Sequence, residues 1–350
     1  MTVNISKPAV NVREKLAELD KPTGIAGEAM LRAETPQEQF NLIGAGRRNL
    51  IINGDFQVWQ RGTSMSSTVN AFTMQTADRW YVVRSLLNQE TDTWGNPYAH
   101  VVCGNYADSN YIQHKVEYPR KLAGKTLTLS FWMKSDDGLG ADGSVYIRNF
   151  NSGSGYDVHV NFESFTFGTE WRQYTFTFDI PESTTFYSDS YGLEIFIYGN
   201  VGSTNQNGKT FDIKEVQLEL GKVATPFEHR SYGEELALCQ RYYFKEGYRQ
   251  YQRYGTGFAY STTGAAIVVH LPTAMRATPA ISTSGASTLG LNYGADTVNA
   301  LSNISINTGG SSEKIVAVSP VVASGLTTGQ AVLLINNNNT NAYMAFDAEL

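Results

Sequence analysis

From Asn49 onward, apolar and polar residues alternate with a period of two, which is the pattern of half-buried β-strands. Turn residues such as Ser152–Gly155 separate these runs at intervals of about ten residues, and no helical pattern lies between them. This arrangement predicts an antiparallel sandwich of the jelly-roll type over residues 49–230. The predicted strands are Leu50–Ile52, Trp80–Val83, Tyr111–Val116, Thr126–Met133, Val145–Ile147, Val158–Phe162, Tyr174–Phe178, Leu193–Tyr198 and Phe211–Leu220.

The first 48 residues show a helical pattern instead. Asn11–Glu14 has the spacing of a capping box, and Val12, Leu16 and Leu19 fall at i, i+4 and i+7. A helix of about ten residues is not stable alone in water, so its apolar stripe needs a partner surface. Two interpretations stay open: a loosely attached tail, or an anchor that becomes ordered against another protein.

Residues 231–247 are predicted as a linker helix, because Ser231 and Glu234 have the spacing of another capping box. Beyond Arg253 charged residues become rare, and residues 248–350 are predicted as a smaller β-sandwich. Asn336–Asn339 is interpreted as a hairpin loop, since Asn tolerates positive φ. The predicted strands are Gly257–Ser261, Ala265–Leu271, Ala280–Thr283, Asn303–Asn307, Ile315–Ser319, Ala331–Asn336 and Ala342–Glu349.

Composition supports a β-rich protein and excludes several function classes. Only 17% of the 350 residues are charged, while aromatic residues reach 12% with 20 Tyr and 17 Phe. The net charge of −6 without a basic cluster argues against a nucleic-acid partner. No apolar stretch approaches the ~18–20 residues of a membrane span. The N-terminal residues do not show the charged and then apolar pattern of a standard signal peptide. We therefore expect a soluble protein without membrane insertion.

Cysteine usage excludes a disulfide framework and a Cys-rich zinc site. Cys103 and Cys239 are the only cysteines, and they lie far apart in the sequence. We expect both to be reduced.

No motif for a cofactor, metal or catalytic centre has its required context. Gly138–Gly143 matches G-x-G-x-x-G, but a strand-like segment follows where a dinucleotide site needs a helix. The five histidines lack metal-ligand spacing, and 33 acidic residues give no means of choosing a glycosidase pair. Asp136, Asp137 and Asp142 could hold Ca²⁺, although the dense calcium-loop spacing is missing. We predict no enzyme activity, no cofactor and no metal, with calcium left open.

Aromatic residues near polar ones raise the question of sugar binding. Trp132 and Trp171 lie in alternating strands and are interpreted as core residues. Trp59, Trp94 and the tyrosine ladder Tyr248–Tyr254 are less obviously buried. Flat rings beside Arg or Asn suit sugar faces, yet aromatics are also common at subunit contacts, so both interpretations stay open.

Several segments together resemble a family of tailed-bacteriophage virion proteins, namely tail fibres and related appendages with a carbohydrate-binding-module-like jelly roll. The segments Asn49–Phe56, Val58–Gly62 and Ala77–Trp80 resemble the family's opening, and Tyr232–Tyr243 resembles its linker helix. Further similar segments are Leu129–Lys134, Trp171–Phe176, Phe211–Glu219, Ala224–Glu228, Leu271–Pro279 and Phe346–Leu350. The resemblance covers about residues 49–350, whereas the N-terminal segment matches no part of it.

The resemblance implies a non-enzymatic, usually trimeric virion appendage that is made in the host cytoplasm and contacts host surface glycans. Residues 1–48 are then expected to bind phage tail or adaptor proteins through Val12, Leu16 and Leu19. Two alternatives remain: a head or collar decoration with a purely structural jelly roll, and a glycan depolymerase. The apolar runs Ala265–Val269 and Ala331–Ile335 place apolar residues on both strand faces, which suits a subunit contact in a homotrimer.

The free end of an N-terminally anchored appendage is its C-terminal domain, so the loops of that domain are expected to meet the host. Asn337 and Asn338 can hydrogen-bond sugar hydroxyls, and the rings of Tyr251, Tyr293 and Tyr343 can stack on sugar faces. These five residues are the candidate glycan contacts, against the alternative of ordinary solvated loops.

Overall fold

The computed structural model describes residues 48–350 with the exception of 67–72, 75–76, 105–109, 136–141, 152–154, 167, 188–190, 200–207 and 295–297. Residues 1–48 and 49–350 are separate compact units, and the account below concerns the second. The anchor residues Val12, Leu16 and Leu19 lie outside the described residues, as do Asp136 and Asp137 and the side chain of Asp142.

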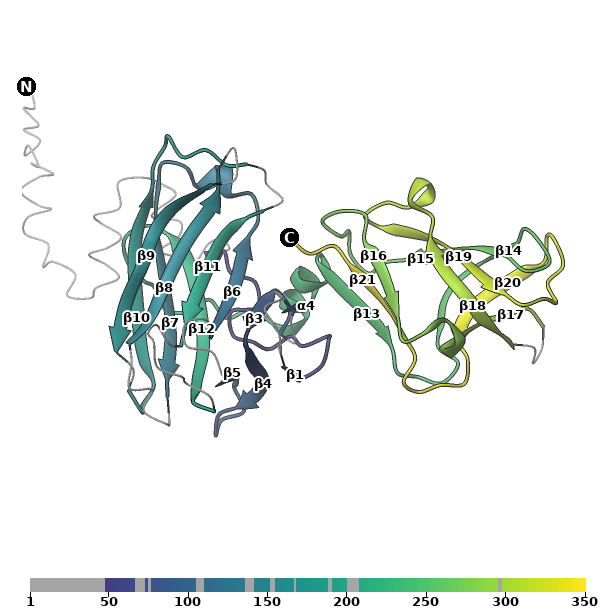
Figure 1. The fold of residues 1–350 in the computed structure, drawn as a ribbon, viewed down its shortest axis with the longest axis horizontal. Coiled ribbons are helices and arrows are strands. Elements are labelled where there is room, and N and C mark those ends of the chain that lie inside the picture. Colours follow the sequence, from purple (N-terminus) through teal and green to yellow (C-terminus); the bar gives the residue numbers. More distant parts are fainter. Residues whose placement is uncertain are drawn as a thin grey trace, which may run out of the picture. The chain divides into compact units, whose positions relative to one another are not determined.

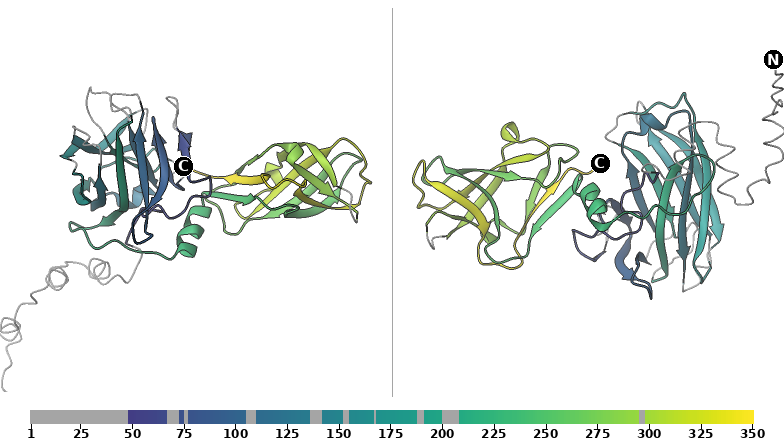
Figure 2. Two further views of the ribbon diagram at one scale, coloured as in Figure 1. Left: turned by 90° about the horizontal axis from the view of Figure 1, so that it is seen from below. Right: turned by 180° about the vertical axis from the view of Figure 1, so that it is seen from behind.

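Two antiparallel six-stranded sheets form a sandwich, and Figures 1 and 2 show them stacked face to face. Sheet A has the order β1-β4-β5-β12-β7-β10 and sheet B the order β2-β3-β6-β11-β8-β9, which confirms the predicted jelly-roll class. The strands of sheet A are β1 (Ser64–Ser66), β4 (Ser85–Thr91), β5 (Pro97–Cys103), β7 (Lys125–Lys134), β10 (Arg172–Ile180) and β12 (Thr210–Leu220). Those of sheet B are β2 (Thr73–Met74), β3 (Trp80–Val83), β6 (Tyr111–Val116), β8 (Asp142–Phe150), β9 (Tyr156–Thr166) and β11 (Leu193–Tyr198), and a 3-10 helix, η1 (Pro119–Leu122), follows β6.

The period of two in the sequence produces the core between the sheets. In β10, Phe176, Phe178 and Ile180 are buried, while Thr177 and Asp179 between them are exposed. The β7 residues Leu127, Leu129, Phe131 and Met133 are fully buried on the same face of sheet A, where Leu127 and Leu129 pair in register with Phe178 and Phe176. Cys103 and Cys239 are both buried and free. Burial of this alternating apolar set is the main force that holds the two sheets together.

The predicted strand Leu50–Ile52 does not form. The Asn49 side chain accepts hydrogen bonds from the backbone N–H groups of Ile51 and Leu218, at 2.9 and 3.1 Å, so it takes positions that a strand partner would occupy. Asn53 then adopts a left-handed φ of 59°, and its amide bonds to the carbonyls of Val58 and Asp78. The opening motif is therefore a structural loop that closes one end of the sandwich.

The predicted linker helix over 231–247 is wrong in its second half. Helix α4 (Tyr232–Gln240) begins after Ser231, whose hydroxyl accepts from the Glu234 N–H, as the capping box predicts. Residues 243–247 form strand β13 instead, which pairs with the end of the chain. Tyr242 and Tyr243 are buried, and an extended backbone lets successive tyrosines reach two different sets of partners, described below.

The C-terminal strands close into a barrel and do not form the predicted sandwich. The barrel has the order β14-β15-β19-β18-β17-β20, and a separate three-stranded sheet has the order β13-β21-β16. Gly257 permits this curvature, because a Cβ there would lie 1.8 Å from the Ala266 carbonyl oxygen. The barrel strands are β14 (Arg253–Ala259), β15 (Ala265–His270), β17 (Leu289–Asn292), β18 (Val298–Ile306), β19 (Ile315–Val322) and β20 (Ala331–Asn336); the sheet strands are β13 (Tyr243–Gly247), β16 (Ala280–Thr283) and β21 (Tyr343–Asp347); two 3-10 helices are η2 (Ala286–Thr288) and η3 (Thr308–Gly310).

Asn336–Asn339 is a connection between the barrel and the three-stranded sheet, so the hairpin interpretation is wrong. Strand β20 pairs with β14 and β17, whereas β21 pairs with β13 and β16. Asn338 nevertheless has the positive φ, 50°, that the turn-forming tendency of Asn predicts.

A buried group of charges joins the jelly roll to the end of the chain, and we call Arg61, Asp78, Arg79 and Glu349 the charged junction. Arg79 bonds to Glu349, and Arg61 lies 3.6 Å from Asp78 and 3.5 Å from Glu349. Arg61 and Arg79 also stack on the rings of Tyr243 and Tyr242, at 3.4 and 3.6 Å from the centroids. Burial raises the pKa of Asp78 to about 7, against the opposing effect of Arg61.

Candidate functional site

The outer face of sheet B carries a concentration of large rings. In β11, Ile195 and Ile197 belong to the core, so Glu194, Phe196 and Tyr198 point to the opposite side. The register places Gln113 and Tyr146 beside Phe196, and Arg148 beside Glu194. We call this surface the aromatic face; it consists of Tyr111, Gln113, Tyr146, Arg148, Phe150, Tyr156, Phe162, Glu194, Phe196 and Tyr198.

The rings of the aromatic face contact one another in a continuous set. Tyr146 stacks on Phe162 with centroids 4.6 Å apart and an interplanar angle of 23°, and it lies 5.6 Å from Phe196. Tyr111 lies 4.7 Å from Tyr198, which is 5.5 Å from Phe162. Phe196 is buried, whereas Phe162 is 44% exposed. The inner rings therefore support outer rings that meet solvent.

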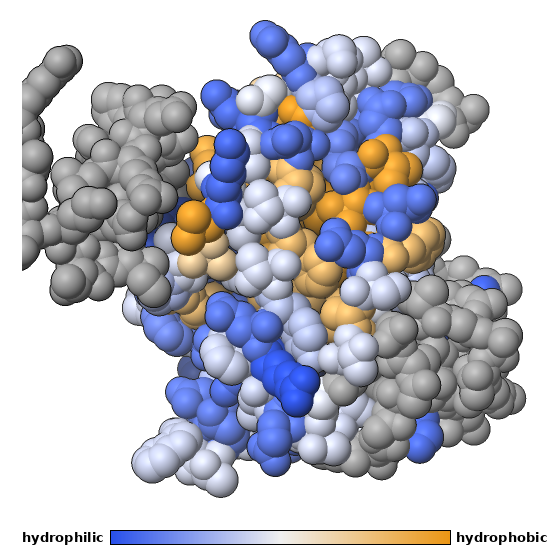
Figure 3. Space-filling view, turned by 90° about the vertical axis from the view of Figure 1, so that its left-hand side faces the viewer, coloured by the Kyte–Doolittle hydropathy of each residue, from blue (hydrophilic) through white to orange (hydrophobic). Residues whose placement is uncertain are grey.

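The outer rings belong to an exposed side of the jelly roll. Tyr156 is 42% exposed, and Val158 beside it is exposed as well. Figure 3 views the side where the ribbons of β9 and β10 lie in Figure 1, and it shows hydrophobic residues between hydrophilic ones. Such a mixed surface can contact a ligand that has both apolar and polar parts.

A row of charged and amide groups crosses the aromatic face between the rings. The Arg148 Nε lies 2.8 Å from a Glu194 carboxylate oxygen, and Gln113 donates to the other oxygen at 3.0 Å. The Arg148 guanidinium also lies 3.8 Å from the centroid of the Tyr156 ring. Within the described residues its two terminal nitrogens make no hydrogen bond. Lys115 also pairs with Glu194, at 3.7 Å, so this one carboxylate contacts both cations of the row.

Two buried polar atoms of the aromatic face region lack a partner among the described residues. These are the side-chain oxygen of Gln113 and the hydroxyl of Ser144, which is paired in register with Tyr198. Buried polar groups are normally hydrogen-bonded, because leaving one without a partner costs about 1–3 kcal/mol. Burial also raises the pKa of Tyr111 to about 12, so its hydroxyl stays a neutral donor and acceptor. The region therefore retains hydrogen-bonding capacity that the described residues do not use.

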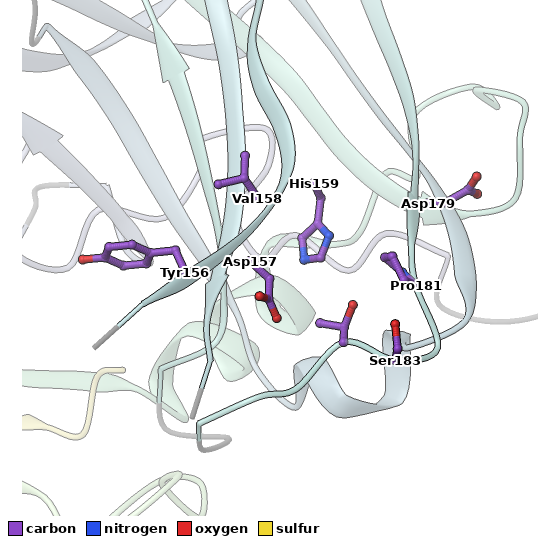
Figure 4. A pocket seen from close by; sticks show the side chains of 8 residues that line it. Tyr156, Asp157, Val158, His159, Asp179, Pro181 and Ser183 are labelled. Atoms are coloured by element: carbon purple, nitrogen blue, oxygen red, sulfur yellow. The ribbon is translucent and has the colours of Figure 1, made fainter. Parts of the chain in front are cut away.

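An open polar pocket of about 570 Å³ lies at the edge strand β9. Figure 4 shows Asp157 and His159 pointing toward the segment that carries Pro181 and Ser183, while Tyr156 points away. His159 contacts the Asn149 side chain at 2.6 Å, and Asn151 donates to Asp157 at 3.0 Å. Burial lowers the pKa of His159, so its ring is neutral at pH 7. The described residues contain no group of three or more His, Cys, Asp and Glu that could hold a metal ion.

The five candidate glycan contacts of the C-terminal domain separate into two places. Tyr251 and Asn338 are exposed, and their loops are joined by a bond from Gln250 to Asn338. Asn337 and Tyr343 belong to the same connection after β20 and the start of β21. Tyr293 lies elsewhere, where its hydroxyl accepts from Asn299 at 2.7 Å.

The tryptophans differ from their predicted roles. Trp132 and Trp171, expected in the core, are half-buried on the outer face of sheet A, where Lys214 lies 4.8 Å from the Trp171 ring centroid. Trp59 is buried and Trp94 is 87% exposed. Trp132 lies in β7 as the alternation predicts, whereas Trp171 lies just before β10, and the alternation did not indicate which face was inside.

The sequence interpretation missed the aromatic face, although a signal was present. In Leu193–Tyr198, aliphatic residues at 195 and 197 alternate with rings at 196 and 198. A strand that is apolar on both faces, with rings confined to one, indicates that the ring-bearing face has a separate role.

No family model matches this chain, and no curated protein matches it. Among solved structures, it is similar to a family 4 carbohydrate-binding module, with 15% identity over 48% of this chain and 98% of that chain and a TM-score of 0.32. It is similar to the CBM22-2 xylan-binding domain of Paenibacillus barcinonensis Xyn10C, with 15% identity, 41% and 92% coverage and a TM-score of 0.33. It is also similar to the enzymatically active domain of bacteriophage CBA120 tailspike protein 4, with 14% identity, 49% and 21% coverage and a TM-score of 0.33.

Proposed function

We propose that this chain is a non-enzymatic carbohydrate-binding protein and that the aromatic face binds the saccharide. The observation that carries the proposal is the row of Gln113, Arg148 and Glu194 set between exposed and buried rings. Rings cover the apolar faces of sugars, and the partly exposed Arg148 guanidinium, held in place by the buried Glu194, can bond to a pair of hydroxyls. Because both cations of the face, Arg148 and Lys115, are already paired with Glu194, the aromatic face favours neutral sugars.

We further propose that the protein is part of a tailed-bacteriophage appendage that contacts host surface glycans. The support is the sequence resemblance of its opening, linker and terminal segments to such proteins. Attachment through Val12, Leu16 and Leu19 remains a prediction, as do the location on the virion and the homotrimer. The part of the chain that the structure describes has no helix that meets the length and hydropathy of a membrane span.

We expect Tyr156→Ala combined with Phe162→Ala to weaken saccharide binding about tenfold or more, because two exposed stacking surfaces are lost. The measurement is binding to an array of bacterial surface polysaccharides, followed by calorimetric titration of the strongest ligand. Tyr232→Ala, an exposed ring on α4, is the matched control and keeps the wild-type affinity.

The proposal fails if the wild-type protein binds no polysaccharide of the array, or if the double variant binds as tightly while remaining folded. Release of reducing ends by the wild-type protein would contradict the non-enzymatic assignment and favour the depolymerase.

The barrel presents a second apolar surface that suits a subunit contact. In β15, Ile267 and Val269 are buried in the barrel, whereas Val268 faces outward and is exposed. Phe258 on β14 is 54% exposed, and Ile315 on β19 is exposed. Exposed apolar side chains on adjacent strands mark an interaction surface.

We expect light scattering to give a trimer mass for the wild-type protein and a lower mass for Phe258→Asp combined with Val268→Asp. Each Asp would place a charge in an apolar contact. Val223→Asp, an exposed apolar site of the jelly roll, serves as the control and stays trimeric. A wild-type monomer at micromolar concentration would refute the subunit contact.

A further inference from the structure

The segment from the last residues of β13 to the first residue of β14 is basic in an otherwise acidic chain. The chain has a net charge of −6, yet residues 245–253 contain Lys245, Arg249 and Arg253 against the single acid Glu246. Glu246 accepts from the Gln252 amide at 2.7 Å on the same segment. Within the described residues, none of the three cations forms an ion pair with a carboxylate. The segment therefore presents positive charges without a paired carboxylate, unlike the aromatic face, where Arg148 and Lys115 both pair with Glu194.

Two tyrosines hold one of these cations near the surface. The Lys245 ammonium lies 4.9 Å from the ring centroid of Tyr248 and 4.3 Å from that of Tyr343. The two rings are 6.2 Å apart and tilted by 34°, and Tyr248 is 53% exposed. A cation held by ring faces keeps its full charge and its hydrogen-bond donors.

The loop that carries these groups is fixed by bonds to the connection after β20. The Tyr248 N–H donates to the Ala342 carbonyl at 2.9 Å, and the Asn336 amide donates to the Arg249 carbonyl at 2.6 Å. The backbone is left-handed at Tyr248 and Tyr251, with φ of 68° and 54°. A loop held in this way loses little conformational entropy when a ligand binds.

We infer that Lys245, Tyr248, Arg249 and Tyr343 form a second saccharide site, which takes a sugar that carries a carboxylate. The cations pair with the carboxylate, the tyrosine rings cover the sugar face, and Asn338 on the adjoining connection bonds to hydroxyls. The inference rests on the proposed function only for the saccharide class. It assigns acidic sugars to this site and leaves neutral sugars to the aromatic face.

The test compares two forms of one backbone, oligogalacturonate and its fully methyl-esterified form, by calorimetric titration of the full chain. We expect the acid form to bind about tenfold or more tightly than the ester, and more weakly as salt is added. Lys245→Gln combined with Arg249→Gln removes this preference. Lys314→Gln, an exposed cation on another loop of the same domain, is the control of equal charge type and leaves it unchanged.

The inference is overturned if the acid form does not bind at millimolar concentration, if both forms bind equally, or if the folded double variant keeps the preference. The variant Tyr156→Ala with Phe162→Ala separates the two sites. If this variant loses oligogalacturonate binding and the variant Lys245→Gln with Arg249→Gln keeps it, the acidic site fails while the proposed function stands. If acid binding persists in it but neutral polysaccharides never bind the wild-type protein, the aromatic face fails while the acidic site stands.

Discussion

Replacing Arg79 with Ala is expected to lower the free energy of unfolding by about 3–5 kcal/mol, because it leaves the buried Glu349 carboxylate with only the longer, 3.5 Å contact to Arg61. Arg79 is itself 1% exposed, and its guanidinium donates to the Lys115 carbonyl at 2.8 Å. The same substitution removes the surface on which the Tyr242 ring packs. The substitution therefore removes an ion pair, a hydrogen bond and a ring contact from the same buried site.

Denaturant unfolding measures this effect, with Arg172→Ala on the exposed edge of β10 as the control that changes little. Glu349→Gln and the double variant complete a double-mutant cycle. A loss below about 1 kcal/mol for Arg79→Ala, or a coupling energy near zero, would show that the charged junction does not stabilise the fold.

The second large effect is expected for Gly54→Ala in the opening motif. A Cβ at this position would lie 2.1 Å from the Val216 carbonyl oxygen, which belongs to the backbone of β12 and cannot rotate away. The Gly54 carbonyl also accepts from the Val216 N–H at 2.8 Å, so a shift that relieves the clash breaks this bond. We expect a loss of about 3 kcal/mol or more of stability.

Thermal and denaturant unfolding of Gly54→Ala are compared with Gly233→Ala. Gly233 lies in α4 with no neighbouring atom within 4 Å of its added Cβ, so Ala there stabilises by about 0.5–1 kcal/mol. Equal stability of the two variants would contradict the close approach of the opening loop to β12.

The sequence predicts a strand well where the residues of that strand are themselves enough to identify it. Leu193–Tyr198, Ala280–Thr283 and Ala331–Asn336 form over the predicted residues. Strands β4 and β5 were missed, because β4 ends in polar residues and β5 begins at a proline. Leu50–Ile52 was predicted and does not form, since a side chain of the neighbouring Asn49 replaces its strand partner. The local periodicity of a sequence gives no information about a side chain that competes with a strand partner for backbone hydrogen bonds.

The candidate sites were harder to predict than the strands, because distant segments build them. Tyr146, Phe162 and Phe196 come together only through the pairing of β8 with β9 and β11. In the C-terminal domain, residue type correctly suggested exposed Tyr251 and Asn338, but the cation between Tyr248 and Tyr343 depends on the pairing of β13 with β21. Residue chemistry selects candidates, and strand register decides which of them meet.

The charged junction has a consequence for the order in which the chain matures on the ribosome. Arg79 and its partner Glu349 are separated by 270 residues. At about 5–20 residues per second, translation delivers Glu349 roughly 15–50 seconds after Arg79. Throughout that interval the carboxylate partner of Arg79 has not been made, while Arg61 has only its contact with Asp78. Closing so long a loop has an entropic cost, so we expect this end of the sandwich to reach its final packing only after Glu349 has been made.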